Sequence, residues 1–234
     1  MRKRGILLII LIIITGILYY QLVESYSTTK HTAKIQRILD GDTIEIENNQ
    51  KIRLLGINTP ETGEFESENA KLFMQQFQNK TIIYETQSRD QYGRILAYVY
   101  YNNQLINKQI LENGLAHLYY YEKDKYYNEL KLAEEKARNS QIGIWTPSKT
   151  NSNCLILVQL KYEEQTRCKN QEQLIIYNNC EEIQATIKDN TASHIYKETI
   201  PAGTFTKNFS CIFNDEGDSL FVWDKEGLLL FYRY

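Results

Sequence analysis

Apolar and polar residues alternate along five short segments of the chain, and alternation with a period of two is typical of half-buried β-strands. The expected strands cover residues 33–39, 43–47, 52–57, 81–86 and 95–101. The turn-forming pair Asn48-Asn49 separates the second strand from the third, and Asn102-Asn103 follows the fifth. The pattern therefore predicts three strands in quick succession, then an interval, then two more.

Apolar residues at helical spacing predict three helices between and after these strands. The first helix carries a stripe at i, i+3, i+4 and i+7, made of Ala70, Phe73, Met74 and Phe77. A short helix is expected over residues 105–113, stopped by Gly114. The third helix ends before Gly143 and carries Tyr126, Leu130, Ala133 and Ala137. This order of elements predicts an α+β fold, a five-stranded barrel of the oligonucleotide/oligosaccharide-binding (OB) type with three helices.

After Pro147 the composition changes, and Ser-Lys-Thr-Asn-Ser-Asn reads as a linker. Alternation resumes in two segments, with apolar positions at Ile156, Val158, Leu160 and Tyr162, and then at Ile183, Ala185 and Ile187. Two apolar runs then flank Lys225-Glu226-Gly227. These segments predict a small all-β sandwich, whose expected partner is another protein or a cell-wall surface. The expected domains are residues 1–30, 31–148 and 149–234.

The first block of the chain predicts membrane attachment. Gly5 to Val23 contains no charged residue and is long enough to cross roughly 30 Å of hydrocarbon as a helix. The basic residues of Met-Arg-Lys-Arg before it favour a cytoplasmic N-terminus, so the rest of the chain is expected outside the cytoplasm. A cleaved signal peptide is the alternative, which would make the protein secreted. Residues 24–32 are expected to form a polar stalk.

The cysteines and the charge narrow the chemistry further. All four cysteines lie in the last third of the chain, at Cys154, Cys168, Cys180 and Cys211. Two disulfides are expected there, with three possible pairings, in keeping with an oxidising compartment. Buried free thiols are the alternative, and a zinc site has less support because no CxxC pair or nearby histidine accompanies the cysteines. The formal charge is −2 over residues 31–148 and −3 over residues 149–234. Because no broad basic surface exists, any phosphate binding must come from a focused site.

Three separated pieces of the predicted barrel carry candidate chemistry: Asp40-Gly41-Asp42-Thr43, Arg53 through Glu61, and Asp90-Gln91-Tyr92-Gly93-Arg94. Each alone is compatible with an ordinary turn or strand end. Together, in this order and spacing, they closely resemble the staphylococcal nuclease family over roughly residues 33–147. The resemblance continues through Glu112-Asn113-Gly114-Leu115-Ala116 and Gly143-Ile144-Trp145.

The resemblance implies a Ca²⁺-dependent nuclease that hydrolyses DNA or RNA and leaves 3′-phosphate ends. It implies that Asp42 and the main-chain carbonyl of Thr59 bind the metal, and Asn58 stands where the founding member has a second metal-binding aspartate. It further implies that Glu61 activates or orients the attacking water. Arg53 and Arg94 are implied to grip the scissile phosphate, and Tyr92 and Tyr120 to line the nucleotide site.

Asn58 departs from the family pattern. Ca²⁺ accepts neutral amide oxygens, so Asn58 can still coordinate, but one negative charge is missing from the metal's ligands. A unit charge pair at contact is worth up to about 4 kcal/mol at an effective dielectric constant near 20. We therefore expect weakened Ca²⁺ binding. The alternative interpretation is a binding or scaffold module that keeps the barrel and has lost turnover.

Overall fold

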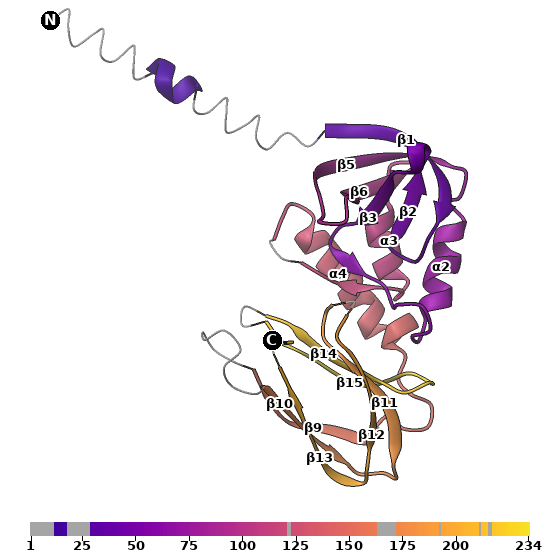
Figure 1. Cartoon of the computed structure of the whole chain (residues 1–234), viewed down its shortest axis with the longest axis vertical. Helices are drawn as coiled ribbons and strands as arrows, with labels where there is room; N and C mark the ends of the chain where they lie inside the picture. The colour runs from indigo at the N-terminus through magenta and orange to yellow at the C-terminus, as the bar shows by residue number, and fades with distance from the viewer. Residues whose placement is uncertain are drawn as a thin grey trace, which may run out of the picture.

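The computed structural model describes residues 12–17, 29–120, 123–162, 172–191, 193–210, 212–214 and 217–234, without the side chains of Thr29 and Gln87. Figure 1 shows two bodies arranged one above the other. The upper one, from β1 to η2, is called the barrel region. The lower one, from β9 to β15, is called the β region.

The barrel region contains a closed five-stranded barrel, as the alternation predicts. Its strands are β1 (Thr29–Ile38), β2 (Thr43–Ile46), β3 (Lys51–Leu54), β5 (Thr81–Arg89) and β6 (Ile95–Tyr101). They pair in the order β3-β2-β1-β5-β6, and a parallel pairing of β3 with β6 closes the ring. The short strand β7 (Gln104–Leu105) extends β6 at one end. Their inward side chains, among them Ile35, Ile44, Ile52 and Val99, are fully buried in one core.

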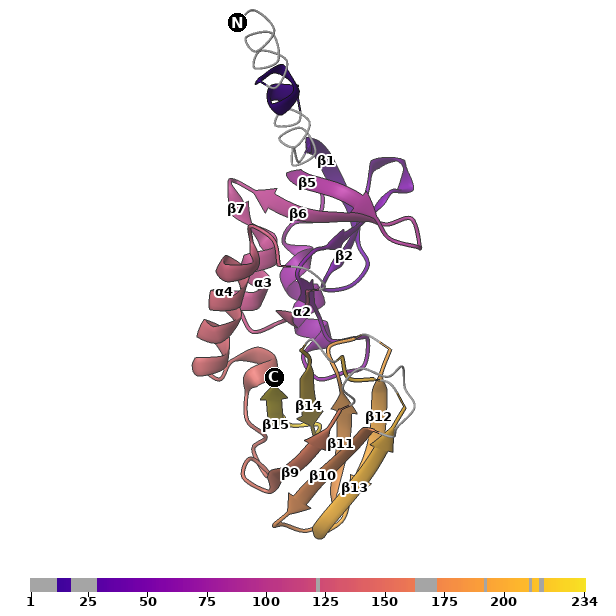
Figure 2. The same cartoon turned by 90° about the vertical axis from the view of Figure 1, so that its left-hand side faces the viewer.

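The three predicted helices are present as α2 (Ser67–Gln75), α3 (Ile106–Glu112) and α4 (Tyr127–Asn139), with 3₁₀ turns η1 (Glu47–Asn49) and η2 (Gly143–Trp145). Ala70 and Met74 of the predicted stripe are buried on α2. Phe77 is also buried, but it lies in the turn beyond the end of the helix. Figure 2 shows α3 and α4 together on one side of the barrel.

Two predicted element boundaries are wrong. The expected strand 52–57 is divided by Gly56, whose φ of +76° turns the chain out of the sheet. The residues after it form a separate strand, β4 (Ile57–Asn58), which pairs with β8 (His117–Leu118). In addition, β1 begins at Thr29 and pairs with β5 from that residue, so residues 29–32 of the expected stalk belong to the barrel sheet.

The β region is the predicted all-β sandwich, built from two antiparallel sheets that share one core. One sheet has the order β13 (Gly203–Phe209), β10 (Glu172–Asn178), β9 (Leu155–Lys161). The other has the order β12 (Ile195–Ile200), β11 (Ile183–Lys188), β14 (Ser219–Trp223), β15 (Leu228–Arg233). A disulfide joins Cys154 to Cys180. Cys168 and Cys211 lie outside the described residues.

The predicted inward face of β9 is wrong in its first half. Ile156 and Val158 are 51% and 59% exposed, whereas Leu155 is buried and Leu157 packs against the core. The pairing of β9 with β10 shifts register between Ile175 and Ile176. Because a shift of one residue reverses which side chains face inward, alternation alone cannot assign the face of such a strand.

The two regions are joined by an apolar cluster and by hydrogen bonds. Trp145 and Ile144 of η2 pack with Phe221 of β14 in one buried cluster. The main chain of β15 continues this contact, because the Leu228 N–H donates to the Thr146 carbonyl at 2.8 Å. At the end of β15, Arg233 forms an ion pair with the fully buried Glu134 of α4. Apolar packing and a buried charge pair therefore both hold the β region against the barrel region.

The predicted membrane segment, Gly5 to Val23, lies outside the described residues except for a helical stretch over residues 12–17. Within the part of the chain that the structure describes, no helix combines the length and the apolar character needed to span a bilayer.

Candidate active site

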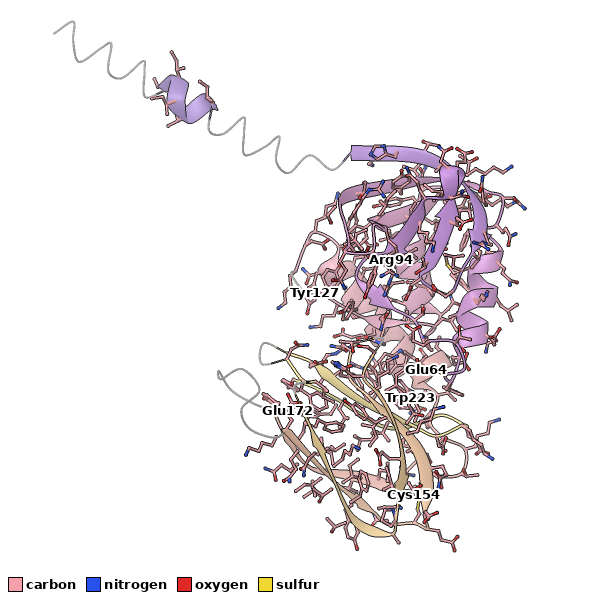
Figure 3. All side chains as sticks on the ribbon, in the orientation of Figure 1. Glu64, Arg94, Tyr127, Cys154, Glu172 and Trp223 are labelled. Atoms are coloured by element: carbon pink, nitrogen blue, oxygen red, sulfur yellow. A yellow bond between two sulfur atoms is a disulfide. The ribbon has the colours of Figure 1, made fainter. Side chains whose placement is uncertain are left out.

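Seven of the eight predicted site residues line a single cavity of about 660 Å³ in the barrel region. They are Asp42, Arg53, Asn58, Glu61, Tyr92, Arg94 and Tyr120. The eighth, Thr59, contacts this group through Asp42. The residues come from the β1–β2 turn, β3, β4 and the loop after it, the β5–β6 turn and the segment after β8. The barrel thus brings together side chains that are far apart in the sequence, and Figure 3 labels Arg94 among them.

Asp42 is the most constrained acid of the cavity and is 5% exposed. One carboxylate oxygen accepts hydrogen bonds from the N–H and the hydroxyl of Thr59, both at 3.0 Å. The other accepts from the hydroxyl of Thr43 at 3.1 Å and pairs with Nε of Arg53 at 3.1 Å. These donors orient the carboxylate and compensate its burial.

The turn before Asp42 explains its position. The carboxylate of Asp40 accepts hydrogen bonds from the N–H groups of Asp42, at 3.0 Å, and Thr43, at 2.6 Å. This arrangement is the turn that an aspartate commonly makes with its own downstream backbone. Between them, Gly41 lies so close to Ala70 and Thr59 that a Cβ would meet their side chains at 2.8 Å. Only glycine allows this approach.

Arg53 is held by four contacts inside the protein. Its Nη1 donates to the main-chain carbonyls of Leu54, at 2.7 Å, and Ile57, at 2.9 Å. Its Nη2 donates to the side-chain oxygen of Asn58 at 2.7 Å, and Nε faces Asp42. A guanidinium has five N–H donors, so one N–H of Nη2 is left beyond these four contacts. These contacts therefore hold the Arg53 guanidinium in one orientation on the wall of the cavity.

Asn58 is 2% exposed and bonds to both regions of the protein. Its oxygen accepts from Arg53, and its amide nitrogen donates to the main-chain carbonyl of Asn190 in the β region at 3.1 Å. An aspartate has no hydrogen to donate to that carbonyl when it is ionised. The contact therefore gives a structural reason for the amide at this position.

Glu61 and Asp40 share an acidic environment with Asp42. Burial raises the pKa of the Glu61 carboxyl, and the charge of Asp42 raises it further, while the ammonium of Lys188 opposes the rise. Burial also raises the pKa of Asp40, and repulsion from Asp42 adds to that rise. Negative charge is thus concentrated on one side of the cavity.

Arg94 occupies the β5–β6 turn and is more accessible than Arg53, with 30% of its side chain exposed against 12%. Its Nε pairs with Asp90 at 2.7 Å, and Asp90 also accepts the N–H groups of Tyr92 and Arg94. The hydrogen bonds to Arg94 outweigh the effect of burial and lower the pKa of Asp90. The Tyr92 ring is 76% exposed, and its centre lies 5.6 Å from the Arg94 guanidinium carbon. Arg94 and Tyr92 therefore present a cation and an aromatic face to solvent.

Tyr119 and Tyr120, in the segment after β8, also line the cavity. The hydroxyl of Tyr120 donates to Asp124 at 3.1 Å and contacts the hydroxyl of Tyr98 at 2.8 Å. Burial raises the pKa of both hydroxyls, so they remain protonated. Tyr121, the third tyrosine of the run, lies outside the described residues.

The candidate metal ligands are all oxygens, namely the carboxylate of Asp42, the side-chain oxygen of Asn58 and the main-chain carbonyl of Thr59. Oxygen ligands suit a hard cation such as Ca²⁺. Across the described residues, no group of three or more His, Cys, Asp or Glu side chains is arranged to hold a metal ion. The carboxyl groups of Asp40, Asp42 and Glu61 nevertheless line the same cavity, and a cation there would relieve their mutual repulsion. The residues fit Ca²⁺ in chemical type, with fewer charges than a site with two carboxylate ligands.

Three residues near the site were not recognised from the sequence: Glu64, Lys188 and Asn190. Lys188 is 2% exposed and pairs with Glu64 at 2.9 Å, and Asn190 accepts from Asn58. Lys188 and Asn190 belong to the β region, more than 120 positions from their partners in the sequence. No local pattern distinguishes them from other polar residues at the end of a strand.

Comparison with known proteins places residues 51–147 in the family described as "Staphylococcal nuclease homologue". The thermonuclease of Staphylococcus hyicus is 30% identical over 134 residues, which are 51% of this chain and 79% of that protein. The thermonuclease of Staphylococcus intermedius is 32% identical over 125 residues, 47% of this chain and 74% of that protein. Endonuclease YncB of Bacillus subtilis (strain 168) is 33% identical over 129 residues, 49% of this chain and 61% of that protein.

Proposed function

The chain belongs to the staphylococcal nuclease family and is a nuclease, and from this membership we propose that it is a Ca²⁺-dependent endonuclease acting on DNA or RNA outside the cytoplasm. The observation that carries the proposal is the meeting of Asp42, Arg53, Glu61 and Arg94 around one cavity. A module that only binds other molecules has no need for all four.

The proposed roles follow from the chemistry of phosphodiester hydrolysis. Attack by water increases the negative charge on the phosphoryl oxygens, so positive groups that face them stabilise the transition state more than the substrate. Arg94, which is partly exposed, supplies a planar pair of N–H donors to the scissile phosphate. Arg53 supplies its remaining N–H from a fixed position. Glu61 orients the attacking water and accepts its proton, for which it must lie within about 3 Å of that water.

In this proposal Asp42, Asn58 and Thr59 hold the Ca²⁺. When bound, the ion supplies positive charge beside the phosphate. Because Asn58 is neutral, the site carries less charge than one with a second carboxylate, and we propose weak Ca²⁺ binding. Extracellular calcium-binding modules work at about 10⁻⁴ to 10⁻³ M, so weak binding is compatible with action outside the cytoplasm.

The proposed location rests on the first block of the chain. The charge-free stretch Gly5 to Val23 follows three basic residues, which supports an anchor with a cytoplasmic N-terminus. Secretion after signal-peptide cleavage remains the alternative. Cell fractionation combined with N-terminal sequencing distinguishes the two. An anchored protein is found in the membrane fraction with Arg2, Lys3 and Arg4 still present, whereas a secreted protein is found in the culture medium without them.

The test of the function is hydrolysis of single-stranded DNA and of RNA by the purified full-length protein, with excess Ca²⁺ or excess chelator. We expect cleavage with Ca²⁺ and none with chelator. The Glu61→Gln variant should be slower by on the order of 10²-fold or more, because a positioned base contributes that much to proton transfer. Equal rates for the two proteins would favour the scaffold interpretation and assign any cleavage to a contaminant. Cleavage in chelator would contradict the Ca²⁺ dependence alone.

A further inference from the structure

The loop that carries Glu61 is closed by two hydrogen bonds with Glu64. The N–H of Glu64 donates to the carbonyl of Glu61 at 2.8 Å. In the reverse direction, the N–H of Glu61 donates to the carboxylate of Glu64 at 2.6 Å. The backbone of Glu61 is therefore positioned by the side chain of Glu64.

The loop that carries Glu61 lies beside two cavities. Glu61 lines the catalytic cavity, and it also lines a second cavity of about 640 Å³ between the two regions. Residues 60–65 line this second cavity from the barrel region, and Lys188 and Trp223 line it from the β region. Figure 3 shows Glu64 and Trp223 at the boundary of the two regions. Beside these cavities, the hydrogen bonds of Glu64 and its charge contribute to where the loop lies.

Lys188, the last residue of β11, reaches this loop from the β region. Its ammonium lies 2.9 Å and 3.2 Å from the two carboxylate oxygens of Glu64, and its side chain is 2% exposed. A buried ammonium is costly unless it is paired, so the pair with Glu64 is strongly preferred over separation. A continuous chain of contacts thus runs from Lys188 through Glu64 to the main chain of Glu61.

The same segment of the β region makes a second contact with the active site. Two residues after Lys188, the carbonyl of Asn190 accepts the amide of Asn58. The N–H of Asn190 is in turn held by Asp218 at 3.2 Å. Residues 188–190 therefore contact the catalytic loop at Glu64 and the candidate metal ligand at Asn58.

We propose that Lys188 is a positioning residue for the nuclease reaction, which acts through Glu64 to hold Glu61 in place, so that the β region is a working part of the active site. The inference rests on the proposed role of Glu61. The aromatic cluster and the Arg233–Glu134 pair hold the two regions together independently of Lys188. Loss of Lys188 therefore alters the loop without separating the regions.

The experiment is a double-mutant cycle on the full-length protein, with kcat and KM measured on single-stranded DNA. Lys188→Met and Glu64→Gln should each lower kcat by about 10- to 100-fold with little change in KM, because misplacement of a catalytic group by about 1 Å costs this much. The double variant should be no slower than either single variant, since both changes break the same chain of contacts. Additive losses would overturn the proposal.

Two further variants separate positioning from general structural damage. Lys188→Arg keeps the charge and has room beside the second cavity, so it should restore most of the kcat lost in Lys188→Met. Lys207→Met removes another ion pair of the β region, Lys207–Glu198 at 2.6 Å, and should leave kcat unchanged. If Lys207→Met lowers kcat as much as Lys188→Met does, the effect is structural and the proposal fails.

A measurement without turnover completes the test. Hydrogen exchange of the peptide that contains Glu61 should be faster in Lys188→Met and in Glu64→Gln, whereas peptides from β1 and β6 should be unchanged. Unchanged exchange at Glu61 would overturn the inference. If the wild type shows no hydrolysis that Glu61→Gln removes, the proposed function fails. If that hydrolysis is present but Lys188→Met retains full kcat, the positioning role alone fails.

Discussion

The side-chain amide of Asn58 donates a hydrogen bond to the main-chain carbonyl of Asn190, 132 positions later in the sequence. The contact joins a candidate metal ligand to the β region. It also means that the neutral side chain at this position, which weakens the expected metal site, has a partner that an ionised carboxylate cannot satisfy.

We therefore expect opposite effects of Asn58→Asp on folding and on metal binding. Without Ca²⁺, the free energy of unfolding should fall by about 1 to 3 kcal/mol, because a buried carbonyl loses its donor. With Ca²⁺, part of the loss should be recovered, because the added charge strengthens binding to the folded state. Thermal unfolding with and without Ca²⁺, together with calorimetric titration of Ca²⁺, measures both. Unchanged stability in chelator would contradict the role given to the Asn190 contact.

Arg94→Ala should reduce kcat by on the order of 10²-fold, by analogy with the loss of one donor to a transition-state oxygen. Its effect on the free energy of unfolding should be below about 1 kcal/mol, because the pair with Asp90 is partly exposed. Steady-state kinetics and chemical denaturation give the two values. Arg37→Ala is the matched control, since that pair with Glu45 is outside the cavity and its arginine is 63% exposed. An equal loss of kcat in both variants would argue against a specific role for Arg94.

Glu85 should make stability depend on pH in the acid range. Burial alone would raise its pKa, but hydrogen bonds from Lys125 and Tyr126, both at 2.7 Å, and from Lys30 outweigh burial and lower the pKa below its ordinary value of 4.5. The unfolded chain then binds the proton more readily than the folded protein. The stabilisation is present above about pH 4.5 and is lost as the pH falls through the folded-state pKa.

The comparison of wild type with Glu85→Gln tests this dependence. Hydrogen bonds to a charged group are worth about 1.5 to 3 kcal/mol, so the variant should be less stable by that order near neutral pH. The difference should shrink as the pH is lowered below about 4.5. Urea unfolding at a series of pH values provides the measurement, with Glu129→Gln as an exposed control. A difference that stays constant down to the acid range would show that Glu85 is not the titrating group.

Arg233→Met should destabilise the protein by about 3 to 5 kcal/mol, because it leaves the fully buried carboxylate of Glu134 without its cation. The N–H of Leu118 still donates to Glu134 at 2.7 Å, but a single neutral donor does not replace a charge. The double variant with Glu134→Gln should recover part of the loss. Denaturation of the two variants, beside the exposed control Lys108→Met, measures these differences. A double variant less stable than Arg233→Met would contradict the explanation.

Much of the barrel region follows from local pattern. Alternation and helical spacing concern neighbours in sequence, and β1, β2, β5, β6 and the three helices all occur where such patterns predict an element, although β1 begins four residues earlier than predicted. The resemblance to the staphylococcal nuclease family predicts that Asp42, Arg53, Glu61 and Arg94 lie close together. Their motifs follow one another along the chain in the family's order, and the barrel brings all four to one cavity.

The parts that the sequence did not predict depend on contacts between distant segments. The predicted strand is divided at Gly56 because the residues after it, β4, pair with β8, some 60 residues later in the sequence. The face of β9 depends on a register shift against β10, which no alternation in β9 itself records. Lys188 lies directly after three alternating apolar residues of β11, and only the packed structure shows that its ammonium is buried beside Glu64.

The distance in sequence between Glu64 and Lys188, 124 positions, has a consequence for the newly made protein. Ribosomes add about 5 to 20 residues per second, so the loop waits on the order of 10 s after its own synthesis before Lys188 has been added. The barrel strands and helices have all been translated by then. A newly made chain thus contains every barrel element before residues 60–65 can contact Lys188, and translation of the β region sets the earliest moment at which the candidate site can reach the arrangement seen here.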